Sequence, residues 1–200
     1  VLKILCETHG MEWNIAVPHN IVGSRQRYDD PFRNVMSIMI NRNLQGKPSI
    51  IYGDGLQTRS FLYIDDCIDA TRLLMQSTFM GPVNIGSEEM VTINQLAEMA
   101  IEISEKNVTI KNIEGEEFVQ KYGFKCPLGV KGRNSDNRLY KEKVGWEVSQ
   151  PLLVGLKKTY QWIKAQVDEK EKNTKWIYES PDGETIYRRE SGDTKREKMN

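Results

Sequence analysis

The feature that most constrains the fold is an alternation of short apolar runs with segments of helical periodicity along residues 1–113. The apolar runs have the length of strands and end near proline, glycine or polar residues, at Trp13–Val17, Ser49–Tyr52, Ser60–Ile64, Pro82–Ile85 and Val108–Ile113. Between them, apolar residues recur at helical spacing over residues 32–44, 65–75 and 92–101. This alternation predicts an α/β protein in which the later segments form an attached smaller domain.

Several boundaries have local signals. Asp65 is expected to cap the second of these helices, and Thr92 with Gln95 three residues later forms a capping box for the third. Residues 114–134, rich in glycine and charge, are expected to form a loop. Ser135 or Asp136 then caps a short helix that ends near residue 145.

The two ends of the chain differ in character. Val1–Gly10 has the pattern of the last turns of a helix ended by a left-handed glycine, so we expect the chain to begin within an element of a longer protein. A last long helix starts after Pro151, and we expect the compact unit, residues 1–167, to end with it. Residues 168–200 are predicted to be a charged tail in which Ser-Pro-Asp-Gly turns a small hairpin that pairs Trp176, Tyr178 and Tyr187 across its strands.

Charge and cysteine usage exclude several classes of partner. The 28 basic and 28 acidic residues cancel, which removes the electrostatic attraction that drives nonspecific nucleic-acid binding. No stretch approaches the roughly 20 apolar residues that span a bilayer, so a membrane partner is also disfavoured. The three cysteines, Cys6, Cys67 and Cys126, include no C-x-x-C pair. We therefore expect free thiols in a reducing cytoplasm, with no disulfide framework and no metal site.

Two glycine-rich loops carry arginine. Gly53–Phe61 places Arg59 where it can contact a phosphate or carboxylate, although a hairpin turn with Arg59 paired to Asp65 or Asp66 is the stronger expectation from the residues alone. Gly129–Asp136 offers Lys131 and Arg133 before a predicted helix N-terminus, and a loop of solvated charges explains it equally well. Because a diphosphate needs donors from several segments, the two loops together favour a phosphorylated ligand.

A third segment follows the first predicted strand. Pro18, His19 and Asn20 occupy the position at which open α/β sheets place ligand-binding groups, although a lone histidine there is more often structural.

Four motifs occur in a characteristic order, namely VPHNIVG at Val17–Gly23, GDGLQTRSF at Gly53–Phe61, VNIGS at Val83–Ser87 and VGW at Val144–Trp146. Together they resemble the C-terminal half of extended short-chain dehydrogenase/reductase enzymes, the NAD-dependent sugar-nucleotide epimerases and dehydratases. Within that family, the segments GDGLQTRSF, VNIGSEEM and GVKGRNSDN are most similar to GDP-mannose 3,5-epimerases. The resemblance covers residues 1 to about 167 and implies the C-terminal part of a Rossmann-type doubly wound domain with a smaller substrate-binding α/β domain.

The resemblance implies NAD as cofactor and a homodimer. By its position on the helix before the first strand, Lys3 matches the lysine of the family's Tyr-x-x-x-Lys pair, whose tyrosine would fall just before Val1. An ordinary exposed lysine is the alternative. Lys3 and Pro18 are the implied cofactor-binding residues, and Lys3 the catalytic one. The ammonium lowers the pKa of the tyrosine, so that the phenolate can take a proton from a sugar hydroxyl.

The resemblance also implies a nucleotide-diphosphate sugar as substrate. Asn20 matches the substrate-contacting asparagine of the family, and Arg133 a diphosphate-binding arginine with Lys131 nearby. The nucleotide-sugar loop is matched by three consecutive residues, Gln57, Thr58 and Arg59. The 200 residues alone are expected to be catalytically inert, since half of the NAD site and the tyrosine would lie outside them.

The chain departs from the family at the position that decides the chemistry. GDP-mannose 3,5-epimerases carry a Glu-Lys-Ala segment whose lysine acts as an acid. At this place the chain has Asp30–Val35, which is more similar to 4-epimerases. Val22 and Ser24 also replace the usual tyrosine and proline. A UDP-glucose 4-epimerase, a dehydratase and a noncatalytic sugar-nucleotide-binding fragment therefore stay open, as does a scaffolding role for the tail.

Overall fold

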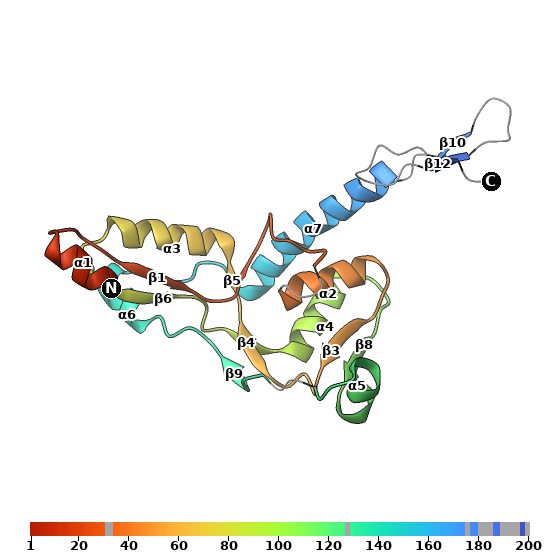
Figure 1. The fold of residues 1–200 in the computed structure, drawn as a ribbon, viewed down its shortest axis with the longest axis horizontal. Helices are drawn as coiled ribbons and strands as arrows, with labels where there is room; N and C mark the ends of the chain where they lie inside the picture. The colour runs from red at the N-terminus through yellow and green to blue at the C-terminus, as the bar shows by residue number, and fades with distance from the viewer. Residues whose placement is uncertain (31–33, 127–128, 175–176, 180–185, 189–196, 199–200) are drawn as a thin grey trace.

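Short strand ladders, most of them parallel, organise the fold (Figure 1). The computed structural model describes residues 1–30, 34–126, 129–174, 177–179, 186–188 and 197–198. The helices in this part of the chain are α1 (Leu2–Thr8), α2 (Val35–Leu44), α3 (Ile64–Gln76), α4 (Ile93–Ser104), α5 (Gly115–Tyr122), α6 (Arg138–Val144) and α7 (Leu152–Thr174). The strands are β1 (Ile15–Pro18), β2 (Ile21–Val22), β3 (Ser49–Tyr52), β4 (Thr58–Ser60), β5 (Leu62–Tyr63), β6 (Pro82–Ile85), β7 (Met90–Thr92), β8 (Ile110–Ile113), β9 (Gly132–Arg133), β10 (Ile177–Glu179), β11 (Ile186–Arg188) and β12 (Glu197–Lys198).

The pairing of these strands confirms the predicted α/β class. β1 pairs with β6, β2 with β5 and β3 with β8, all in parallel. β4 is shared, because it pairs antiparallel with β7 and parallel with β9. Each parallel pair joins strands separated by at least one helix in the chain, as parallel connections require.

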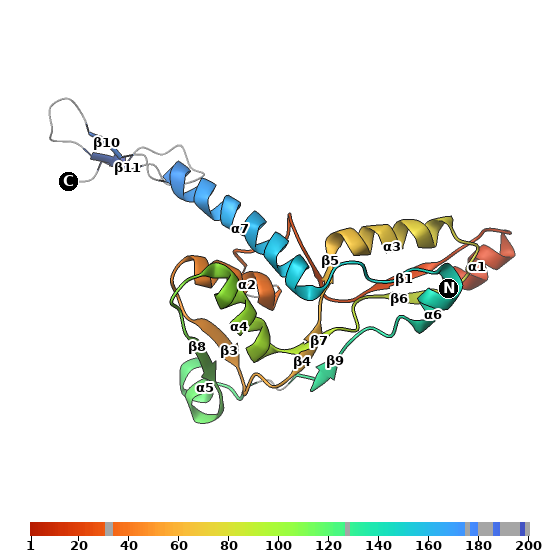
Figure 2. The ribbon, with the colours of Figure 1, turned by 180° about the vertical axis from the view of Figure 1, so that it is seen from behind.

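One core lies between α2, α4, α7 and β3, and we call these elements with β8 the helical unit. Their inward-facing side chains are fully or almost fully buried, among them Met36, Ile40, Ile51, Leu96, Leu156 and Ile163. The predicted capping box starts α4, since Thr92 Oγ1 accepts from the Gln95 amide at 3.1 Å and Gln95 Oε1 accepts from the Thr92 amide at 2.8 Å. Figure 2 shows α2, α4 and α7 lying against one another in this unit.

A second core lies between β1, β6, α3 and α6, and we call these elements with α1 the β1–β6 lobe. Its buried residues include Leu74, Val83 and Ile85, with Tyr140 stacked on Trp146 at 5.1 Å between ring centroids. The Tyr140 hydroxyl donates to the carbonyl of Ala70 on α3. α6 is thereby fastened to α3.

Several local predictions are wrong. The glycines at 53 and 55 do not turn a hairpin, because β3 pairs with β8 and β4 pairs elsewhere. Asp65 does not cap α3, which begins one residue earlier with Tyr63 as its N-cap residue. Part of the expected loop over residues 114–134 forms α5, whose apolar residues Phe118 and Tyr122 pack on Tyr52.

The N-terminal and C-terminal segments have most of the expected local structure. α1 is followed by Gly10 in the left-handed region, with φ +64°. The predicted cap of α6 at Ser135 or Asp136 is wrong, because Asn137 is the N-cap residue, although Asp136 Oδ1 accepts from the main-chain amide of Arg138 at 3.1 Å. α7 continues to Thr174, beyond the predicted end near residue 167. β10 and β11 form the predicted antiparallel pair with Tyr178 opposite Tyr187, whereas Trp176 lies outside the described residues.

All three cysteines are free thiols. None of the helices in the described ranges combines the length and the apolar character needed to traverse a bilayer.

Candidate functional site

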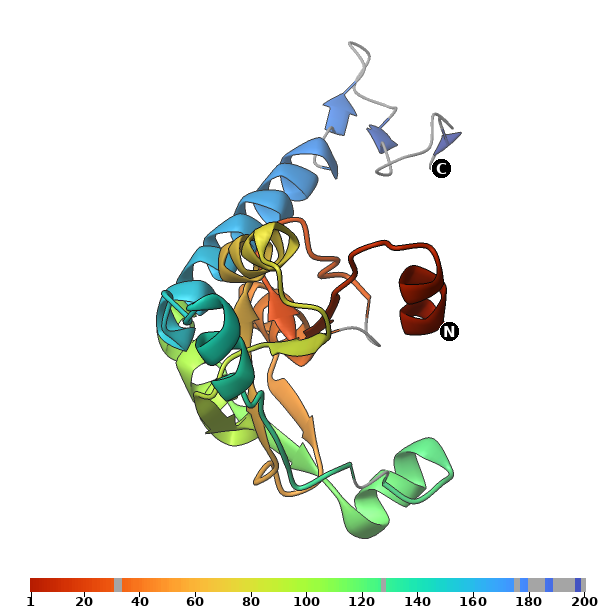
Figure 3. The same ribbon diagram turned by 90° about the vertical axis from the view of Figure 1, so that its left-hand side faces the viewer.

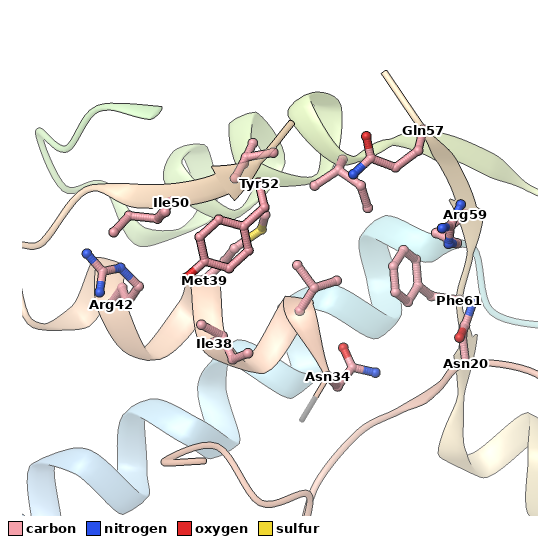
Figure 4. Close-up of a pocket in the computed structure, with 13 residues that line it drawn as sticks. Asn20, Asn34, Ile38, Met39, Arg42, Ile50, Tyr52, Gln57, Arg59 and Phe61 are labelled. Atoms are coloured by element: carbon pink, nitrogen blue, oxygen red, sulfur yellow. The ribbon is translucent and has the colours of Figure 1, made fainter. Parts of the chain in front are cut away.

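A cavity of about 540 Å³ opens between three elements of the structure. α2 forms one wall, β3 a second, and the segment from Gln57 to Phe61 a third (Figure 4). The polar side chains that line it are Asn20, Asn34, Arg42, Tyr52, Gln57 and Arg59. Apolar groups of the helical unit, including Ile38 and Met39, complete the lining. A cavity with a few polar groups on an apolar wall is the usual form of a small-molecule site.

Three of the predicted binding residues, Asn20, Gln57 and Arg59, line this cavity together. Thr58 follows Gln57 on β4, and its amide donates to the carbonyl of Lys131 at 2.8 Å. Thr58 and Gly132 are register partners, and a Cβ at Gly132 would lie 2.8 Å from Thr58 Oγ1. Glycine at this position therefore lets β9 approach β4 closely.

Arg59 and Arg133 are register partners in the parallel pair β4–β9, although 74 residues separate them in the sequence. Residues side by side in a parallel ladder project to the same face. Arg59 Nη1 donates to the carbonyls of Thr58 at 2.7 Å and Val130 at 2.9 Å. Within the described ranges neither arginine has a carboxylate partner, so the predicted pairing of Arg59 with Asp65 or Asp66 is wrong.

Asp66 has other partners. Its carboxylate is buried and accepts from the amides of Ser149 and Gln150 and from the Ser149 hydroxyl. A carboxylate used in this way fixes the segment before α7 and is not available to the arginines on β4 and β9. Two guanidinium groups on one face can bind an anion with several oxygens.

Asn20 lies where β1 ends and holds an uncommon backbone conformation, with φ +40°. Its side-chain amide donates to the carbonyl of Ser60 at 3.0 Å, and its own carbonyl accepts from the amide of Leu62 at 3.2 Å. Asparagine tolerates positive φ better than most residues, and such conformations concentrate at functional sites. Asn20 therefore joins the carboxyl end of β1 to the arginine-bearing segment.

Three polar residues that line the cavity were not predicted from the sequence as binding residues. Asn34 caps α2, accepting from the amide of Met36 at 2.9 Å. Arg42 donates to the carbonyl of Pro48 at 2.7 Å, and the hydroxyl of Tyr52 lies 3.1 Å from that of Tyr122. The hydrogen bond to Tyr122 and partial burial raise the pKa of Tyr52. Tyr52 lies at the carboxyl end of β3, directly before a glycine turn, and this position in the sequence could have indicated a binding residue.

Lys3 and Pro18 are not among the residues that line the cavity. Lys3 lies on α1 with an exposed side chain, and its Nζ is 3.9 Å from Glu7 Oε1. Figure 3 shows α1 standing away from the other helices. Pro18 is the last residue of β1 and the register partner of Ile85. The roles of both residues remain predictions.

Comparison with known proteins places this geometry in a family. Residues 1–86 match the model of the NAD dependent epimerase/dehydratase family. This part of the chain is similar to members of that family. The resemblance carried by the sequence motifs is thereby confirmed.

Curated relatives in the epimerase/dehydratase group extend the match. The chain is 50% identical over 122 residues to GDP-mannose 3,5-epimerase from Arabidopsis thaliana, a match that covers 61% of this chain and 29% of that protein. It is 34% identical over 148 residues to UDP-glucuronic acid decarboxylase 5 from the same plant, covering 74% and 40% of the two chains. The chain thus spans well under half the length of these relatives.

Solved epimerase structures share the fold. UDP-glucose 4-epimerase from Thermotoga maritima, solved with UDP-glucose, has a TM-score of 0.68 and 29% identity, with 83% of this chain and 50% of that chain covered. UDP-N-acetylglucosamine 4-epimerase from Methanobrevibacter ruminantium, solved with UDP-N-acetylmuramic acid, has a TM-score of 0.72 and 25% identity, with coverage of 82% and 50%. The Rossmann-type epimerase fold is therefore the fold of the matched part of this chain.

The family implies NAD, and the β1–β6 lobe fits it. The carboxyl ends of the parallel strands β1 and β6 coincide at Pro18 and Ile85, which is where open α/β sheets bind nucleotides. Among the described strands β1 pairs only with β6, and Ile15 and Val17 are each 38% exposed. This edge has room for the further strands that a dinucleotide site needs.

Proposed function

We propose that this chain supplies the nucleotide-sugar-binding part of an NAD-dependent sugar-nucleotide epimerase of the GDP-mannose 3,5-epimerase type. The observation that carries the proposal is the juxtaposition of Arg59 and Arg133 on one face of β4–β9, without carboxylate partners in the described chain, beside a cavity of about 540 Å³. The 50% identity to GDP-mannose 3,5-epimerase from Arabidopsis thaliana supports the type.

The two arginines hold the diphosphate. Each guanidinium can donate two parallel hydrogen bonds to phosphate oxygens, and two of them neutralise the two charges of a nucleoside diphosphate link. Gln57 and Asn20 then face the sugar from the same side of the cavity, and Lys131 adds a third cation near β9. The apolar wall from α2 excludes water from this contact.

NAD, when bound at the carboxyl end of β1, supplies reversible hydride acceptance from the sugar. In this proposal the Lys3 ammonium lowers the pKa of a tyrosine that takes the hydroxyl proton. Pro18 terminates β1 and lines the cofactor edge. By themselves, the 200 residues are inert in this proposal, whereas they bind the nucleotide sugar.

A 4-epimerase is the second candidate, and Asn34 favours it. A 3,5-epimerase must remove and return protons beside a carbonyl, which requires an acid/base group across the ring. Asn34 lines the cavity in this neighbourhood, its side chain caps α2, and a carboxamide neither gives up nor takes up a proton as an acid or base at neutral pH. Arg33, the other residue available there, lies outside the described residues.

Isothermal titration of the chain with GDP and with UDP tests the proposal. We expect one of the two to bind and Arg59→Ala to weaken it, whereas no binding of either would refute the proposal. In a protein that also contains an NAD-binding half, turnover in deuterated water separates the two chemistries. Solvent deuterium at carbons 3 and 5 identifies the 3,5-epimerase, and an epimerised product without label identifies direct hydride return at carbon 4.

The proposal extends to a homodimer in the cytoplasm. Light scattering of the purified protein measures the oligomeric state, and imaging of a tagged copy in cells shows the cellular location. A monomer, or accumulation in a membrane-bound compartment, would contradict these two parts without touching the ligand.

A further inference from the structure

The strand that carries Arg133 cannot be fixed by burial. β9 consists of two residues, Gly132 and Arg133, and both are exposed. β4 pairs with both residues of β9, and beyond this ladder the Thr58 amide and Arg59 Nη1 reach the main chain on the N-terminal side of β9, at Lys131 and Val130. The segment on the C-terminal side of β9 is held by another part of the molecule.

That part is Asn137, the N-cap residue of α6, which is 8% exposed. Asn137 Nδ2 donates to the carbonyl of Gly86 at 2.7 Å, and Asn137 Oδ1 accepts from the fully buried hydroxyl of Ser135 at 2.6 Å. The main-chain amide of Asn137 also donates to Glu88 Oε1 at 3.1 Å. One side chain thus connects the turn after β6 to the segment that leaves β9.

The two segments are in van der Waals contact at this point. A Cβ added at Gly86 would lie 2.4 Å from Ser135 Cβ and 2.9 Å from His19 Cβ, so glycine is required there. The Ser135 amide donates to the carbonyl of Ser87 at 3.3 Å, and Asn84 Nδ2 donates to the carbonyl of Asp136 at 3.1 Å. The end of β6 is therefore a rigid base on which residues 135–137 are fastened, two residues after Arg133.

We infer that Asn137 is a positioning residue for nucleotide-diphosphate binding, which acts by holding β9 in register so that Arg133 stays beside Arg59. Asn137 itself does not contact the ligand in this inference. It rests on the proposed function, because the consequence of the positioning is read at the diphosphate.

The test compares Asn137→Ala with Arg133→Ala, with the double variant and with Asn14→Ala in the 200-residue chain, using GDP and UDP as probes. Asn14 is the matched control, because its Nδ2 also donates to a main-chain carbonyl, that of Leu74 at 3.0 Å, at the other end of β1. Arg133→Ala should weaken binding about 10- to 100-fold, as for a contact to a charged group. Asn137→Ala should weaken it about 2- to 10-fold, the equivalent of one neutral hydrogen bond, and Asn14→Ala should leave it unchanged.

Two measurements distinguish a positioning role of Asn137 from a general loss of structure in Asn137→Ala. In the Arg133→Ala background, Asn137→Ala should cause no further loss of affinity, whereas a merely structural role gives additive losses. By amide hydrogen exchange, the Thr58 amide, bonded to Lys131, should exchange faster in Asn137→Ala, while the Gly53 amide, bonded to Ile113, should not.

The outcomes distinguish this inference from the function on which it rests. If the unchanged chain binds neither nucleotide, the proposed function fails and this inference with it. If Arg133→Ala weakens binding while Asn137→Ala leaves both affinity and Thr58 exchange unchanged, or if the two losses add, only the role of Asn137 is overturned.

Discussion

The helical unit and the β1–β6 lobe are built from the same kinds of element but are closed to different degrees. In the helical unit, α2 and α4 pack on β3, α7 packs on both helices, and side chains such as Ile40 and Leu156 have no exposed surface. In the lobe, β1 leaves Ile15 and Val17 each 38% exposed, and Leu2, Ile4 and Leu5 on α1 are 47% to 68% exposed. The lobe has a core of its own and an uncovered apolar edge beside it.

This difference fits the proposed division of roles, in which the helical unit forms a wall of the sugar-nucleotide cavity and the β1–β6 lobe holds the cofactor. A closed unit can hold its cavity wall in place without help, since burial of its helices supplies the stability. The lobe offers an open edge to further strands at the proposed cofactor site. β4, with its partners β7 and β9, lies between the two regions and carries the arginine that faces the cavity (Figure 1).

The largest effect expected is on the closed core. Leu156→Ala removes a side chain with no exposed surface on α7 and should lower the free energy of unfolding by about 2–5 kcal/mol, through lost burial and the cavity left behind. Leu153→Ala, a matched change at a 40% exposed position of the same helix, should cost about 0.5 kcal/mol or less. Urea denaturation measures both. Equal losses would show that the helical unit is not the stable part.

The next largest effect is a loss of ligand affinity that leaves the stability of both cores unchanged. Arg59→Ala should reduce the affinity for the nucleoside diphosphate by about 1.5–3 kcal/mol, the range for hydrogen bonds to charged groups. Arg72→Ala, which removes an exposed arginine of α3 paired with Asp69, should leave affinity unchanged. Titration calorimetry gives the affinities and thermal melting the stability. A large fall in melting temperature with Arg59→Ala would assign this arginine to the fold instead.

The lobe is tested by the buried hydroxyl of Tyr140. Tyr140→Phe removes the hydrogen bond from the hydroxyl to the carbonyl of Ala70, and should cost about 0.5–1.5 kcal/mol of unfolding free energy. Tyr160→Phe in the helical unit is the matched control, because no hydrogen bond of its hydroxyl is found along the described chain, and should be nearly neutral.

Burial also raises the pKa of Tyr140 to about 12 from 10.0, so the protonated form is the one that stabilises the fold. Its contribution is complete below pH 10 and is lost as pH rises through about 12. The fall in stability between these values should be smaller in Tyr140→Phe. An identical pH profile for both proteins would contradict this assignment.

The smallest effect concerns one helix end in each region. Thr92→Ala removes the capping box of α4 in the helical unit and should cost about 1 kcal/mol. Thr8→Ala removes an exposed hydroxyl that bonds the carbonyl of Ile4 in α1, and should change stability by less than about 0.5 kcal/mol. Denaturant midpoints compare the two, and a larger loss at Thr8 would reverse the ranking of the regions.

Local signals predicted the elements whose causes lie within a few residues. The capping box at Thr92, the left-handed Gly10 and the apolar stripe of α7 are of this kind, because each depends on neighbours along the chain. The prediction failed at Asp65, because α3 already begins at Ile64, directly after β5, and Asp65 therefore lies inside the first turn of the helix. It also failed at α5, whose helix is stabilised by packing Phe118 and Tyr122 on Tyr52, a contact that spans about 70 residues.

The amino-acid sequence by itself determined the α/β class, the family motifs and the chemical types available to the site, since these depend on composition and on spacing along the chain. Only the tertiary structure decided that Arg59 pairs in register with Arg133, that Asp66 is engaged elsewhere and that Tyr52 and Asn34 line the same cavity. The register of β4 with β9 joins segments 74 residues apart, and no local propensity specifies which residues of two distant strands lie side by side.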